Sequence, residues 1–163
     1  MKNKDLFNST VDILVTAYKN GDLTHGLCAA CAVGNLICAN MYDNNKDKWD
    51  DNRVVWSKDN FLTGDPPLSW MDVFCSHVIE TAGGGSKWSQ HFDITNYKGK
   101  IKDQIDSTGY TVEELASIEF AFEAVEQTGD VMLKGLYAVY DVLCTIHEVD
   151  MQEVATGEEV FVK

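Results

Sequence analysis

Positive charge is scarce in this sequence. Of its 163 residues, 26 are acidic and 13 are basic, which gives a formal net charge of −13, and Arg53 is the sole arginine. Contacts to nucleic-acid phosphates need clustered Lys and Arg side chains. The composition therefore argues against binding to nucleic acid or to an anionic membrane surface. An acidic surface suits a basic partner surface, or serves only solubility.

Long apolar runs are also missing. The least polar stretch, residues 27–41, contains Asn35 and Asn40 and is shorter than the ~20 apolar residues of a membrane-spanning helix. The N-terminal segment lacks the pattern of an export signal. The five cysteines are an odd number and show no regular disulfide framework. We therefore expect a cytoplasmic protein with reduced thiols.

Helical periodicity dominates the rest of the chain. Apolar side chains recur at intervals of three and four residues, and the strand–helix alternation of a parallel sheet is missing. The pattern predicts an all-α fold: one compact domain of five or six helices over residues 1–163. The predicted helices span residues 4–20, 24–42, 70–81 and 100–106, followed by one that starts after Thr111 and one over 131–149.

Three features of this predicted fold bear on function. The helix over 24–42 is small or apolar on nearly every side, which predicts a central position. The last two helices are separated by a short hinge at Gly129 and Asp130, which predicts an antiparallel hairpin. A long polar loop over 43–68 carries two tryptophans, and residues 150–163 form a tail.

The strongest local motif is His25-x-x-Cys28-x-x-Cys31. On a helix this spacing would bring the three side chains to one broad face. Imidazole and thiolate ligands suit zinc or iron, and Cys75 or His77 would complete such a site from another helix. Core packing is the alternative, because a free cysteine behaves as a small buried apolar residue. The Cys28–Cys31 spacing also occurs in redox motifs, but the βαβ context of those motifs is missing.

A ligand site at the predicted helix start is the third interpretation. Free N–H groups and the positive end of the dipole make a helix N-terminus suitable for phosphate or carboxylate. Thr24, His25 and Gly26 would frame the site. Asn35, if it points inward, needs polar partners. The walls would be aromatic rings able to stack on a base: Trp49, Trp56 and Trp70.

No catalytic arrangement emerges from the titratable residues. Glu119, Glu123 and Glu126 are expected to face water, and His147 is expected near a helix C-terminus, where positive charge is favourable. We therefore favour a protein without catalytic activity, and the sequence indicates no particular cofactor.

The segments HGLCAACAVGNLICANM (25–41) and GYTVEELASIEFAFE (109–123) resemble a family of small uncharacterised proteins from phages and prophages of Bacteroidetes. The resemblance extends to about Val149 and implies no activity or site residues. It implies a small accessory protein made in a bacterial cell during phage carriage or infection.

Two functions fit that context. One is a sponge that sequesters a small nucleotide-like signal of host defence. The other is an acidic inhibitor that blocks a basic host surface. A sponge should have a pocket with convergent polar groups, whereas an acidic inhibitor should carry its acids on one face. A metal-binding protein is the further alternative. A helix rich in small residues would also suit a homodimer interface.

Overall fold

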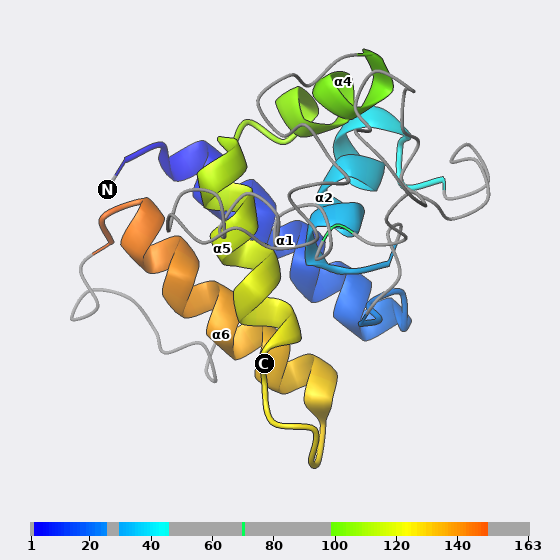
Figure 1. The fold of residues 1–163 in the computed structure, drawn as a ribbon, viewed down its shortest axis with the longest axis vertical. Coiled ribbons are helices and arrows are strands. Elements are labelled where there is room, and N and C mark those ends of the chain that lie inside the picture. Colours follow the sequence, from blue (N-terminus) through cyan, green and yellow to red (C-terminus); the bar gives the residue numbers. More distant parts are fainter. Residues whose placement is uncertain (1, 26–29, 46–69, 71–98, 150–163) are drawn as a thin grey trace, which may run out of the picture.

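The computed structural model describes residues 2–25, 30–45, 70 and 99–149, and within these residues the fold is all-α (Figure 1). The longer elements are α1 (Lys4–Asn20), α5 (Val112–Glu123) and α6 (Val131–Ile146), and the shorter ones are α2 (Ala32–Met41) and α4 (Gly99–Ser107). No helix in this part of the chain is long and apolar enough to cross a membrane.

Helix α1 has the bounds that the sequence predicts. The Asn3 side chain accepts a hydrogen bond from the N–H of Leu6 at its start, and Gly21 ends it with φ of 73°. A left-handed residue at this position is least costly for glycine. Phe7, Val11 and Leu14 lie along the buried face of the helix, so this face of α1 packs against the core.

Helix α2 is the central apolar element, but it begins later than predicted. The helix was expected from Thr24 or His25, whereas it starts at Ala32 with Cys31 as its N-cap. Residues 32–38 are all buried. Buried side chains all round the helix confirm its central position. The late start removes His25 and Cys31 from a common helical face, because neither lies within the helix.

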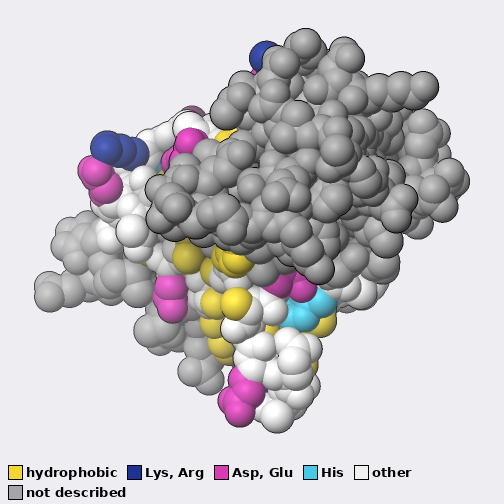
Figure 2. Space-filling model, viewed as in Figure 1, with side chains coloured by type: hydrophobic (Ala, Val, Ile, Leu, Met, Phe, Trp, Pro, Cys, Tyr) yellow, Lys and Arg dark blue, Asp and Glu magenta, His cyan; other side chains and the backbone are white. Residues whose placement is uncertain are grey.

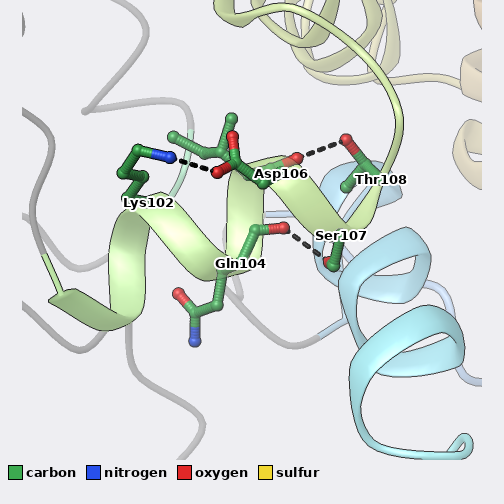
Figure 3. A network of polar contacts seen from close by, with 6 residues as sticks. Lys102, Gln104, Asp106, Ser107 and Thr108 are labelled. Atoms are coloured by element: carbon green, nitrogen blue, oxygen red, sulfur yellow. Dashed lines mark hydrogen bonds and ion pairs between the residues drawn. The ribbon is translucent and has the colours of Figure 1, made fainter.

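Helix α4 confirms the short helix expected near residues 100–106. Figure 3 shows its local polar contacts: Lys102 pairs with Asp106, and the Ser107 hydroxyl donates to the Gln104 carbonyl oxygen. The Gln104 side chain also donates to the Tyr42 hydroxyl at 3.3 Å. The Thr108 hydroxyl donates to the carbonyl oxygen of Ile105. These hydroxyl groups satisfy carbonyls that a helix end leaves without partners.

Helices α5 and α6 form the predicted antiparallel hairpin, side by side in Figure 1. The predicted capping box is present, with Thr111 and Glu114 each bonding the other's backbone N–H. Two bounds were wrong. Helix α5 ends at Glu123 rather than near Gly129, and α6 ends at Ile146 rather than near Val149. The connection is therefore longer than the predicted hinge.

A buried polar chain joins the two ends of the described fold. The His147 Nδ1 lies 2.6 Å from the Lys2 carbonyl oxygen, which can only accept, so Nδ1 carries a proton. In a neutral ring, Nε2 then accepts from the Tyr110 hydroxyl at 2.9 Å. The Tyr110 oxygen lies 2.8 Å from Thr10 Oγ1. Burial raises the pKa of Tyr110 to about 12, so its hydroxyl keeps its proton.

Several predicted segments lie outside the described residues. They include nearly all of the 43–68 loop, the 150–163 tail and the predicted 70–81 helix apart from Trp70. Trp70 itself is helical and fully buried among the core residues.

Candidate functional site

Asn35 fastens the connection between α1 and α2. Its side chain is inward-facing, which is the case in which the amide was expected to need polar partners, and the residue is 5% exposed. The Asn35 Nδ2 lies 3.1 Å from the carbonyl oxygen of Asp22, 2.9 Å from that of Ala30 and 3.0 Å from that of Cys31. One amide group therefore holds both described ends of the connection.

The first turn of α2 is capped by groups of the protein itself. The Glu119 Oε2, on α5, accepts a hydrogen bond from the N–H of Val33 at 3.1 Å. The Cys31 Sγ accepts from the N–H of Gly34 at 3.3 Å. The sequence had suggested an anion site at a helix start near Thr24. At the observed start of α2, a carboxyl group and a sulfur atom accept from the Val33 and Gly34 N–H groups.

Thr24 and His25, two of the residues expected to frame a ligand site, are among the described residues. Thr24 is exposed, and its N–H donates to the Ala30 carbonyl oxygen at 2.7 Å. His25 turns toward α5, where its ring meets the Phe122 ring edge-on with centroids 4.5 Å apart. Gly26 lies outside the described residues.

His25, Cys31, Glu119 and Glu123 gather where α5 meets the start of α2, and we call them the Glu119 cluster. The side chains of His25 and Glu123 are 16% and 12% exposed, with 3.9 Å between His25 Nδ1 and Glu123 Oε2. Glu119 is 0% exposed. Its Oε1 and the Nε2 of His25 are buried without a hydrogen-bond partner among the described residues.

The expectation that Glu119 faces water was wrong. Glu119 follows Leu115 by four residues and precedes Phe122 by three, so it shares their buried helical face. This spacing was the available signal in the sequence. Its partner, the N–H of Val33, lies 86 residues earlier in the chain, and nothing local in the sequence points to it.

The cluster shifts the protonation of its members. Burial raises the pKa of Glu119 to about 8; the N–H of Val33 lowers it and the adjacent Glu123 carboxylate raises it. Burial also raises the pKa of the Cys31 thiol well above its usual range, and the Glu119 carboxylate adds to that rise. Cys31 therefore stays a neutral thiol, which makes it a weak nucleophile and a weak metal ligand.

The metal hypothesis receives no support from the described residues. No three His, Cys, Asp or Glu side chains in this part of the chain converge to hold an ion. Of the proposed ligands, only His25 and Cys31 are described, and Cys28 and Cys75 lie outside.

The tryptophans give no visible stacking wall. Trp70 is 0% exposed and belongs to the core, so it presents no ring to a ligand at the surface. Trp49 and Trp56 lie outside the described residues.

A hollow of about 260 Å³ lies between α1 and α2. Its apolar lining residues are Ile13, Ala17 and Cys38. Six polar residues complete the lining: Asp12, Thr16, Asn20, Asp22, Asn35 and Asn44. Sequence reasoning found Asn35 but missed the others, because their convergence depends on how α2 packs along α1.

Among the described residues visible in Figure 2, Asp and Glu side chains lie at several separate places, with few Lys or Arg side chains beside them.

Comparisons with protein-family models, with curated proteins and with solved structures found no match for this chain.

Proposed function

We propose that this protein is a non-catalytic binding protein that takes a small ligand in the hollow between α1 and α2. The observation that carries the proposal is the convergence of six polar and three apolar residues around one hollow. Ligand sites commonly combine an apolar lining with a few polar groups that fix orientation. The volume is slightly below the usual range of about 300–1,000 Å³, so the hollow suits one ring or a similar fragment.

The chemistry of the lining favours a particular part of a nucleotide-like ligand. Amide side chains both donate and accept hydrogen bonds, as the edges of nucleobases require. Asn20 and Asn44 contribute two such amides, whereas the Asn35 Nδ2 is already bonded to backbone carbonyl oxygens. No Lys or Arg is among the lining residues. The base, rather than the phosphates, would therefore enter the hollow. With the phage resemblance, such a ligand fits a sponge for a defence signal.

Calorimetric titration with nucleosides tests this function. Adenosine, guanosine, cytidine and uridine serve as probes, together with their 5′-monophosphates. Thr16→Phe places a ring in the hollow, and we expect it to weaken binding of the preferred nucleoside at least tenfold. Ser117→Phe, at an exposed position of α5, is the matched control and should bind as the unmodified protein does.

The monophosphate series adds information about orientation. A base held in the hollow predicts similar affinity for a nucleoside and its monophosphate. If no nucleoside binds, or if Thr16→Phe binds as well as the Ser117→Phe control, the proposed site is wrong.

A further inference from the structure

A fully buried carboxyl group with one oxygen lacking a partner is unusual. Carboxylates are almost never completely buried unless they are paired, and a buried charge without compensation is costly. Glu119 has one satisfied oxygen, Oε2, through the N–H of Val33. Its Oε1 has no donor to accept from among the described residues.

Protonation resolves this imbalance. A protonated Oε1 becomes a donor, and the Glu123 carboxyl group beside it is a suitable acceptor. Glu123 in turn lies next to the imidazole of His25. In this arrangement the protonated Glu119 donates to the Glu123 carboxylate and accepts a hydrogen bond from the N–H of Val33 at the start of α2.

We propose that Glu119 is a pH-sensitive latch: its protonated carboxyl group lets the start of α2 pack against α5. Its ionisation loosens that packing, because burying the new charge costs more than the strengthened hydrogen bond from the Val33 N–H returns. The inference is independent of any ligand in the hollow.

The groups around the latch support this assignment. From its own helix, Glu123 faces Glu119 and disfavours a second negative charge. From the segment before α2, Cys31 contributes a thiol that stays neutral over the same pH range, because burial raises the pKa of that thiol. The His25 imidazole lies beside Glu123. From α2, the N–H of Val33 donates to Glu119 Oε2.

Ionisation has a defined direction of effect. The pKa of Glu119 is raised to about 8 in the folded protein, whereas an unfolded chain has a glutamate pKa of about 4.3. Between these values the folded state holds a proton that the unfolded state releases. Stability from this group is therefore present at low pH and is lost as the pH rises toward 8.

The test compares Glu119→Gln with the unmodified protein in urea unfolding from pH 5 to pH 9, with EDTA in every buffer. Glutamine keeps both hydrogen bonds and cannot ionise. We expect the unfolding equilibrium constant of the unmodified protein, relative to that of Glu119→Gln, to rise by nearly tenfold per pH unit across the middle of this range. It should level off above about pH 8. Glu126→Gln, at an exposed position, should show no such trend.

Two further measurements use the unmodified protein, so the inference stays testable if Glu119→Gln does not fold. Carboxyl carbon NMR should show Glu119 titrating several pH units above the ordinary glutamate value of about 4.3. Hydrogen exchange at the Val33 and Gly34 amides should accelerate above pH 8 more than at the amides of α6. A flat ratio of unfolding constants, or a Glu119 titration at the ordinary glutamate value, overturns the latch. Unchanged relative exchange at Val33 overturns the loosening of α2.

Discussion

At the scale of single residues, the buried amide of Asn35 decides how α2 is attached to α1. Its Nδ2 carries two protons and lies within hydrogen-bond distance of three carbonyl oxygens, so one proton is shared. Buried carbonyl groups need such partners. The same residue lines the hollow, and its amide is therefore committed to holding the backbone while its flank faces the proposed ligand.

Replacing this donor should be costly. We expect Asn35→Ala to lower the free energy of unfolding by about 2–3 kcal/mol, because it leaves buried carbonyls without a donor. Asn35→Asp should cost more at pH 7, because a carboxylate would face those oxygens. Urea unfolding measures both. Asn40→Ala is the control, since Asn40 is exposed and its side chain donates to the Leu36 carbonyl oxygen of its own helix. An equal loss of unfolding free energy in Asn35→Ala and Asn40→Ala would contradict the role of Asn35 in holding the connection between α1 and α2.

The prediction that Glu119 lies at the surface rested on the chemistry of its side chain and ignored its spacing along the helix. The chemistry of a glutamate predicts a surface position, whereas its spacing from Leu115 and Phe122 places it on the buried face. The Val33 N–H, distant in the sequence, makes that burial tolerable. Asn35 was correctly expected to need partners, but which carbonyls it bonds depends on the folded connection.

At the scale of elements, local start and stop signals were predictable and tertiary ones were not. The bounds of α1 and the capping box of α5 follow from neighbouring residues. The start of α2 depends on Glu119 from another helix, so the sequence placed it too early. The Glu119 cluster lies at that start, which explains why most of its geometry escaped prediction.

The contact between α5 and α6 depends on the absence of a side chain at Gly135. A Cβ atom there would lie 2.7 Å from Phe122 Cδ2 and 2.9 Å from the Phe122 carbonyl oxygen. Alanine ordinarily stabilises a helix interior by about 1 kcal/mol relative to glycine. Here the helices would have to separate, and Phe122 also packs on His25.

We therefore expect Gly135→Ala to lower the free energy of unfolding by about 1–3 kcal/mol, the usual cost of overpacking. Thermal and urea unfolding check this, with Thr145→Ala as a control at an exposed position of α6. A Gly135→Ala protein more stable than the unmodified one would show that α5 and α6 do not approach this closely.

At the scale of the whole molecule, the net charge of −13 makes self-repulsion part of the energy of folding. The ion pairs Lys2–Glu148 and Lys102–Asp106 are exposed, and exposed pairs offset little of it. Salt screens such repulsion, with a Debye length of about 10 Å at 0.1 M. Stability at pH 7 should thus rise between about 10 and 300 mM NaCl, by roughly 1 kcal/mol if many weak pairwise terms of the usual size add up.

Near pH 4.5, the isoelectric point of the sequence, the repulsion is largely cancelled and the same salt series should change stability much less. Urea unfolding at both pH values separates this effect from the Glu119 latch, because the latch shifts stability with pH at constant salt. An equal salt response at the two pH values would mean that net charge does not limit the stability of this fold.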